Sequence, residues 1–223
     1  MKILKRSLFD TPKSRSPSHR NKILFIGNKA NFQTFGKSYF DGKKILPGYG
    51  GYRYDSRYFN SVKQIINLLK LEKKERIVEL GCAKGFILFE FWKLGFKNIY
   101  GQDISSYAKN NSKPEIKKFI STKCISKIQA KNNSVKFLFC KETLPHLTKK
   151  KLKKTFSEIS RTVKKDGIIY FEIQTGRTDI SLKKMRQWDP THKILERAHW
   201  WKRTIQKAFP KNYNLIIYFK YLF

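Results

Sequence analysis

Apolar residues recur along most of the chain at the spacings that helices and strands require. In SVKQIINLLKL (61–71) they fall on one face of a helix, whereas RIVEL (76–80) is a short apolar run typical of a buried strand. The pattern predicts helices at 61–71, 84–94, from 105, at 152–163 and at 197–209, strands at 76–80, 98–104, 134–140, 168–174 and 213–223, and a loop at 176–193. This alternation favours an α/β fold with a doubly wound, mostly parallel sheet.

Three regions of the chain differ in character. Residues 1–22 are rich in Lys, Arg, Ser and Pro, which predicts a basic, disordered tail, with a transit peptide as the alternative. Residues 23–60 mix glycine and aromatic residues without a regular period, so we expect an N-terminal extension that either packs on the domain or forms a lid over a small ligand. Residues 61–223 carry the regular α/β pattern.

The chain of 223 residues has a formal net charge of +33, from 49 basic and 16 acidic residues. This excess favours RNA or another polyanion as a partner, although codon usage that enriches lysine is an alternative explanation. No apolar run approaches 18 residues, so no membrane span is expected.

The cysteines and histidines are few and scattered. Cys82, Cys124 and Cys140 lack C-x-x-C spacing, which indicates a reducing compartment and a cytoplasmic location rather than a disulfide framework. The four histidines have no metal-ligand spacing with one another or with a cysteine, and no metal is predicted.

The segment VELGCAKG (78–85) lies between a predicted strand and a predicted helix. Gly81 and Gly85 permit a tight turn at which a ligand can approach the backbone. Asp103 ends the next strand about 20 residues later, where an acid accepts hydrogen bonds from ribose hydroxyls in Rossmann-type folds. Together these features predict a nucleoside-containing ligand.

Glu79 in the strand and the glycines after it form acid-x-G-x-x-x-G, which resembles motif I of class I S-adenosylmethionine-dependent methyltransferases. The resemblance extends over roughly residues 32–223, through GQDIS (101–105), FLFCKETLPHL (137–147), ISRTVKKDGIIYFEI (159–173) and WDPTHK (188–193). FGKSYFDG and GYGGYRYDSR are similar to a bacterial subgroup that acts on small molecules or glycans.

The resemblance implies a Rossmann-like methyltransferase fold, S-adenosyl-L-methionine as the cofactor, and an N-terminal lid with Tyr52 or Tyr54 facing the ligand. The residues that it places at the cofactor are Glu79, Gly81, Cys82, Ala83, Gly85, Asp103, Ile104, Cys124, Cys140 and Tyr54.

The sequence also departs from the family pattern. Cys124 stands where an acid or amide usually meets the adenine, Val135 and Lys136 replace a common Phe-Asp pair, and Ala83 replaces the middle glycine of motif I. Because acids common in the family are missing at Cys124 and at Lys136, an alternative hypothesis is a catalytically degenerate relative that binds RNA or the ribosome.

An oxygen acceptor must lose its proton during methyl transfer, and histidine is suited to that task near neutral pH. His192 and His146 are the candidates, with Asp189 as a partner, and a structural role for each histidine is the alternative. The chain lacks the N-P-P-Y and D-P-P-Y segments of base amine methylation, the Pro-Cys pair of cytosine C5 methylation and a recognisable Lys-Asp-Lys-Glu tetrad of ribose methylation. A small-molecule or glycan acceptor is therefore the leading hypothesis, and RNA is the second.

Overall fold

The fold is built around a seven-stranded sheet in which every strand pairs in parallel, in the order β1-β7-β6-β5-β2-β3-β4. The computed structural model describes residues 1–9, 35–42, 48–209 and 213–223. The strands are β1 (Lys2–Leu4), β2 (Ile77–Leu80), β3 (Ile99–Gln102), β4 (Ile120–Ser121), β5 (Val135–Lys141), β6 (Val163–Thr175) and β7 (Asn214–Tyr221). The predicted doubly wound α/β sheet is confirmed.

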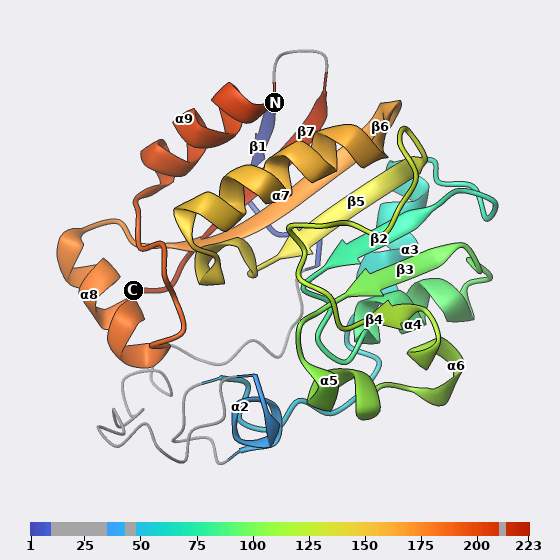
Figure 1. Cartoon of the computed structure of the whole chain (residues 1–223), viewed down its shortest axis with the longest axis horizontal. Helices are drawn as coiled ribbons and strands as arrows, with labels where there is room; N and C mark the ends of the chain where they lie inside the picture. Colours follow the sequence, from blue (N-terminus) through green and yellow to red (C-terminus); the bar gives the residue numbers. More distant parts are fainter. Residues whose placement is uncertain (10–34, 43–47, 210–212) are drawn as a thin grey trace.

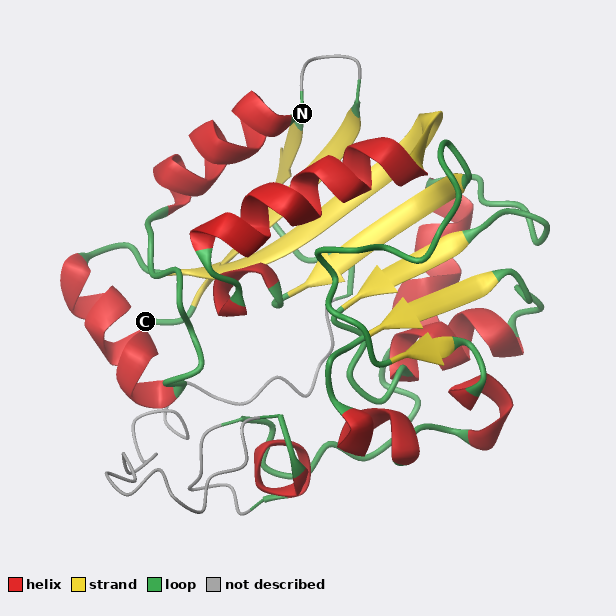
Figure 2. Ribbon diagram, viewed as in Figure 1, coloured by secondary structure: helices red, strands yellow, loops and turns green. Residues whose placement is uncertain are grey.

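Helices cover both faces of the sheet, with α7 and α9 on the near face and α3 and α4 behind it (Figures 1 and 2). The helices are α2 (Lys37–Asp41), α3 (Phe59–Leu68), α4 (Phe86–Lys93), α5 (Ser106–Asn110), α6 (Pro114–Lys117), the 3-10 turn η2 (Leu144–His146), α7 (Lys149–Thr162), α8 (Asp179–Trp188) and α9 (Ala198–Ala208).

Side chains alternate across the sheet and divide the interior into two cores. In β5, Phe137 and Phe139 belong to the core beneath α3 and α4, whereas Leu138 and Cys140 belong to the core beneath α7 and α9. Because both faces are covered, β5 is a nearly continuous apolar run, as strands of parallel sheets commonly are.

The predicted disordered tail is wrong for the part of it that the structure describes. Residues Lys2–Leu4 form an edge strand in parallel register with β7, and the Phe9 ring is 2% exposed and packs 4.9 Å from the ring centroid of Phe139. Three strand residues are too few to produce a readable alternation, which is why the pattern missed them. Residues 10–22 of the predicted tail lie outside the described residues.

The predicted loop at 176–193 is also corrected, because α8 occupies most of it. Thr178 accepts a hydrogen bond from the Ser181 backbone N–H, the Ser181 hydroxyl is bonded reciprocally to the Thr178 N–H, and Met185 is fully buried. The exposed Ile180 interrupts the apolar period, so the helix was not visible in the sequence. The strand predicted at 168–174 begins earlier, at Val163, so the KKDG segment (164–167) lies within β6.

Of the N-terminal extension, residues 35–42 and 48–60 are described; 23–34 and 43–47 fall outside. Among the described helices, none combines the length and apolar character needed to cross a bilayer.

Candidate functional site

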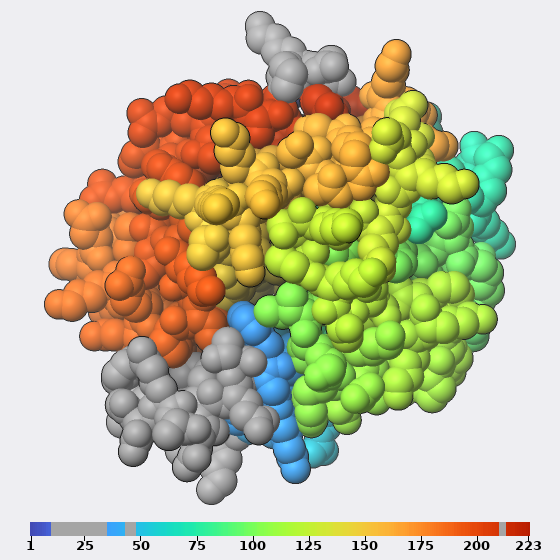
Figure 3. All heavy atoms as spheres, in the orientation of Figure 1, coloured from blue at the N-terminus to red at the C-terminus, as the bar shows by residue number. Residues whose placement is uncertain are grey.

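Two adjoining cavities lie at the carboxyl ends of the central strands. The first is lined by residues of the segment 48–58, by Glu79 and by Trp188, and the second by Asp103, Ile104 and Cys124. Seven residues line both cavities, namely Tyr39, Tyr49, Gly81, Ala83, Lys141, Glu142 and His146. In the space-filling view α2 lies beside the opening between the two halves of the molecule (Figure 3).

The turn after β2 is held against β3. The Gly81 N–H donates to the Gln102 carbonyl over 2.7 Å, and the Ala83 N–H donates to Asp103 Oδ2 over 2.8 Å. Gly81 has a φ of +74°, and a Cβ there would lie 2.0 Å from Thr143 Oγ1. A side chain at this glycine would therefore meet Thr143, so a substitution would disturb the fold before it reached a ligand.

Asp103 is placed where the sequence predicted, at the edge of the second cavity with Ile104 and Cys124. Besides the bond from Ala83, its Oδ1 accepts the Ser105 N–H over 2.9 Å. Burial raises the pKa of this carboxyl, and the two backbone donors oppose that shift. Each oxygen keeps acceptor capacity for a ligand, since a carboxylate offers about four lone-pair sites.

Glu79, in β2, is 4% exposed and lines the first cavity beside Cys82. Its Oε2 is buried and has no hydrogen-bond partner in the described structure. Burial raises the pKa of this carboxyl well above its usual range, and Lys141 opposes the rise. An unpaired buried acceptor is costly unless a ligand supplies a donor, so Glu79 is a ready contact for a cationic or N–H group.

Three residues expected at the cofactor, Tyr54, Gly85 and Cys140, line neither cavity. Tyr54 turns toward α4, where its hydroxyl donates to Glu90 over 2.9 Å. Gly85, with a φ of +69°, leaves room for the side chains of α6 and β4 rather than for a ligand. Cys140 is fully buried on the α7 side of the sheet, and burial raises the pKa of its thiol to about 12.

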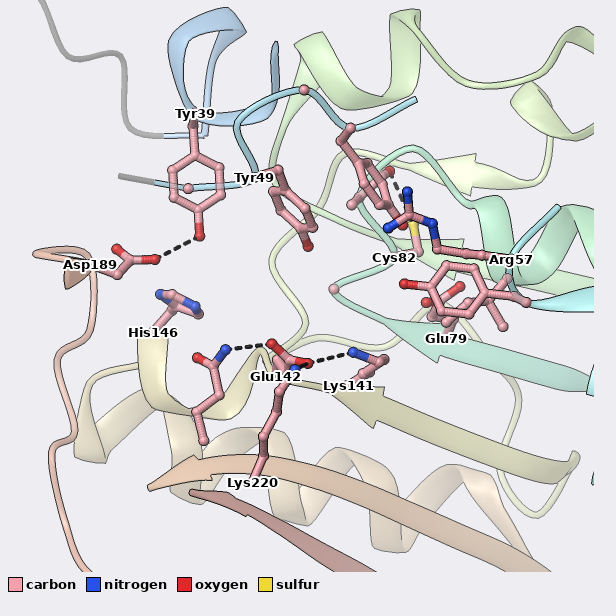
Figure 4. Close-up of a pocket in the computed structure, with 18 of the residues that line it drawn as sticks. Tyr39, Tyr49, Arg57, Glu79, Cys82, Lys141, Glu142, His146, Asp189 and Lys220 are labelled. Carbon is pink, nitrogen blue, oxygen red and sulfur yellow. Dashed lines mark hydrogen bonds and ion pairs between the residues drawn. The ribbon is translucent and has the colours of Figure 1, made fainter. Parts of the chain in front are cut away.

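His146, Asp189 and His192 are brought together, as Figure 4 shows for the first two. His146 Nδ1 lies 2.8 Å from Thr191 Oγ1, which donates to Asp189 Oδ1 over 2.5 Å, and the Tyr39 hydroxyl donates to Asp189 Oδ2 over 3.0 Å. The imidazole of His192 lies behind that of His146, with ring centroids 4.6 Å apart.

His192 itself is 4% exposed and lines neither cavity, although the sequence favoured it slightly over His146. Its Nε2 is bonded to Gln174 Oε1 over 2.8 Å, and burial, reinforced by His146, lowers its pKa to about 4. One ligand atom from each of His146, Asp189 and His192 lies within 4.8 Å of the others, a spacing that a metal ion can use.

The sequence missed a charged floor formed by Lys141, Glu142, Glu172 and Lys220 at the ends of β5, β6 and β7. Glu142 forms ion pairs with Lys141 over 2.5 Å and with Lys220 over 2.6 Å. Lys141 also forms an ion pair with Glu172 over 3.2 Å. Burial alone would raise the pKa of Glu142, but the two lysines hold it well below its usual range. Glu142 has a φ of +59°, a strained backbone of the kind that clusters at functional sites. The only sequence signal was that each apolar run ended in charged residues.

The sequence also missed an ion pair between the motif I turn and α2. Lys84, 5% exposed, donates to both oxygens of Asp41 over 2.8 and 2.6 Å and to the Tyr52 carbonyl over 2.8 Å. The Tyr107 hydroxyl donates to the same carboxylate over 2.7 Å. Burial would raise the pKa of Asp41, but the Lys84 and Tyr107 bonds outweigh it and hold the pKa below its usual value. These bonds fasten α2 and the segment 48–58 to the site.

Comparisons with known proteins identify this arrangement. Residues 78–171 match the family described as "Methyltransferase domain". The solved structure of the YcgJ protein from Bacillus subtilis is 15% identical with a TM-score of 0.55, and covers 67% of each chain. A SAM-dependent methyltransferase from Archaeoglobus fulgidus is 18% identical with a TM-score of 0.53, and covers 66% of each chain. No protein among the curated sequences matches.

The match spans the turn, Asp103 and β5 with Lys141 and Glu142, and it ends at residue 171, before Glu172 and β7. Residues 78–171 thus carry a methyltransferase domain, and the activity that this match supports is S-adenosylmethionine-dependent methyl transfer. Its own residues fit that donor: the unpaired Glu79 Oε2 suits the amino group, and Asp103 beside Ile104 and Cys124 suits the adenosine. The N–H groups of Gly81, Cys82, Ala83 and Gly85 are all bonded within the protein, so none of these four is a free backbone donor for a ligand.

Proposed function

We propose that this methyltransferase transfers a methyl group to a hydroxyl oxygen of a small-molecule or glycan acceptor. The observation that carries the proposal is the position of His146 at the junction of the two cavities. The second cavity would take the adenosine over Asp103 and the amino group of the donor would reach Glu79, which leaves the tyrosine-lined part of the first cavity for the acceptor. A base at that junction adjoins both the donor and the acceptor.

The lining of the first cavity supports a small polar acceptor. Tyr39, Tyr49, Tyr52 and Tyr58 face it with Trp188, and Figure 4 shows Tyr39 and Tyr49 opposite His146 and Glu142. Burial raises the pKa of all four phenols, so they remain neutral hydrogen-bond donors with flat apolar faces. Such a surface suits a sugar or phenolic ring that carries hydroxyl groups.

Methyl transfer requires the reacting oxygen, the methyl carbon and the sulfur to lie in line, and the bound donor supplies a methyl group that is already activated. The protein therefore positions the acceptor, excludes water and accepts a proton. We place this reaction in the cytoplasm: all three cysteines are free thiols, and two of them are buried.

The test incubates the protein with methyl-labelled S-adenosylmethionine and a panel of sugars and phenols, and locates the label by NMR. The proposal expects an O-methyl product and calorimetric binding of S-adenosylhomocysteine. Label on nitrogen or carbon, or acceptors that are all macromolecular, would refute it. Tyr49→Ala should raise KM for the acceptor, whereas Ile180→Ala, on an exposed position of α8, serves as the matched control.

A basic surface favours RNA-directed methylation as the second candidate. Helices α7 and α9 share the near face of the sheet (Figure 1), and both carry exposed cations that have no ion pair within the described residues. These cations are Lys150, Lys153, Lys154, Lys202, Arg203 and Lys207. Lys151, on the same helix, lines the second cavity, so the surface continues to the site.

Fluorescence anisotropy with a structured RNA at 50 and 200 mM salt separates the two candidates. RNA-directed activity expects binding that weakens steeply with salt, because counterions are released from the phosphates. The variant Lys153→Glu/Lys154→Glu should then weaken binding strongly. The control Lys63→Glu/Lys70→Glu changes the same charge near α3, on the opposite face, and should have a smaller effect.

A further inference from the structure

We propose that Nε2 of His146 is the general base of this reaction, and that Thr191, Asp189 and Tyr39 form a hydrogen-bonded relay that sets its tautomer. The inference rests on the proposed function, because only an acceptor that must lose a proton requires such a base. Of the four groups, His146 would touch the acceptor, and the other three are positioning residues.

The tautomer follows from counting protons along the relay. Asp189 receives three donors: the Thr191 N–H over 2.9 Å and the Thr191 hydroxyl over 2.5 Å at Oδ1, and the Tyr39 hydroxyl at Oδ2. An ionised carboxylate only accepts, so the single hydroxyl proton of Thr191 is committed to Asp189. The 2.8 Å contact between Thr191 Oγ1 and His146 Nδ1 must then use the proton of Nδ1. The lone pair of the neutral ring is left on Nε2.

The ring of His146 is held from two sides. The edge-on ring of Phe35 lies 5.7 Å away at 87°, and the tilted ring of His192 lies 4.6 Å away at 34°. His192 is fixed in turn by Gln174. With Nδ1 bonded to Thr191 and two rings in contact with it, the imidazole is held in one orientation at the junction of the cavities, as general-base catalysis requires.

The relay joins two segments that are far apart in the sequence. Asp189, Thr191 and His192 come from the WDPTHK segment after α8, where the Asp189 side chain caps the Thr191 backbone N–H. Tyr39 comes from α2, which the Lys84–Asp41 ion pair fastens to the motif I turn. The relay is therefore complete only when α2 is docked, which couples the orientation of the base to closure of the site.

The proposed step balances as follows. The acceptor O–H proton moves to Nε2 of His146, and the oxygen electron pair forms the bond to the methyl carbon. The electron pair of the carbon–sulfur bond stays on sulfur, so the cationic sulfonium becomes a neutral thioether. The imidazolium that results is stabilised through Thr191 by the carboxylate of Asp189, and it returns its proton to water after product release.

Several charged or titratable groups lie around His146. They are Asp189 from the loop after α8, Asp103 from the end of β3, Lys141 and Glu142 from the end of β5, and the neighbouring ring of His192. Substituting Thr191 changes none of these charges, so it isolates the relay.

The test compares Thr191→Val with Thr191→Ser in the full-length protein, by nitrogen-15 NMR of the histidine rings and by kinetics. In the wild type and in Thr191→Ser, His146 should show a protonated Nδ1 and an unprotonated Nε2. Thr191→Val should lose this single tautomer, and kcat should fall about tenfold to a hundredfold with little change in the affinity for S-adenosylhomocysteine. His146→Gln should lower kcat at least as far.

Two results would overturn the relay: an unchanged tautomer with an unchanged kcat in Thr191→Val, or a proton on Nε2 in the wild type. A zinc ion that binds stoichiometrically and shifts both His146 and His192 resonances would also overturn it, since the lone pair would then be a metal ligand. The ring measurement needs no acceptor. Failure of the O-methylation assay with the expected tautomer intact would therefore refute the proposed function and leave the relay standing.

Discussion

Replacing Lys84 by Met should release the N-terminal segment from the site. The methionine preserves most of the side-chain volume but removes the three hydrogen bonds that Lys84 donates to Asp41 and to the Tyr52 carbonyl. The side chain of Lys84 is 6% exposed and that of Asp41 is 22% exposed, so the substitution leaves a mostly buried carboxylate without its cation.

The magnitude follows from what Asp41 retains. Breaking a buried ion pair by removing one partner costs about 3–5 kcal/mol. Asp41 still accepts the Tyr107 hydroxyl and the Tyr52 N–H, and part of it reaches water, so we expect about 2 kcal/mol. That corresponds to about a 30-fold loss in the docking equilibrium of the segment.

Hydrogen exchange read by mass spectrometry measures this directly. Backbone amides of 48–58 should exchange up to about 30-fold faster in Lys84→Met, and S-adenosylhomocysteine should bind more weakly by up to the same factor. The double variant Asp41→Asn/Lys84→Met leaves no orphaned charge and should recover part of the loss. Lys37→Met, at an exposed position of α2, is the matched control. Exchange and affinity within twofold of the wild type in Lys84→Met would refute the reasoning.

Three further predictions use the same site. Asp103→Ala should weaken binding of S-adenosylhomocysteine about tenfold to a hundredfold by calorimetry, and Asn, which keeps an acceptor, should lose less; unchanged affinity would rule out a ribose contact. His192 has a pKa of about 4 when folded and about 6.5 when unfolded, so the unfolded state binds a proton more readily between these values. The stability that the neutral His192 contributes is present above about pH 6.5, and the free energy of unfolding should fall by about 3 kcal/mol as the pH falls toward 4. Urea unfolding across that range should therefore be less steeply pH-dependent in His192→Gln, and parallel curves would contradict this. Finally, segment 48–58 should gain protection from exchange when S-adenosylhomocysteine binds, and a segment that is slow and indifferent to the ligand would be packing alone.

The sequence was informative wherever one local pattern determined the structure. The apolar period placed α3, and the run before Gly81 placed β2. The helix predicted from 105 is also present, and Ser105 is its N-cap, since its hydroxyl accepts the Ala108 N–H over 2.9 Å. Asp103 could be placed at the cavity because carboxyl ends of neighbouring parallel strands meet at one edge of the sheet.

What the sequence could not supply are contacts between distant segments. Lys84 was only a variable position of motif I until α2 brought Asp41 to it. The relation of His146 to Thr191 likewise depends on how η2 packs against the loop after α8. Tyr54 was misplaced because glycine-rich backbone leaves the direction of each ring undetermined, and only packing on α4 fixes it.

The edge strand β1 has a consequence for how the molecule assembles. It precedes the other strands in the chain, yet its partner in the sheet is β7, the last of them, so the pairing closes a loop of nearly the whole chain. Contacts of such long range are expected to form late in folding. Ser7 follows this strand, and its hydroxyl donates a hydrogen bond to Glu172, which belongs to the charged floor. The pairing of β1 with β7 therefore also places the hydroxyl that bonds to the charged floor, so the N-terminal segment supports the site from the far end of the sheet.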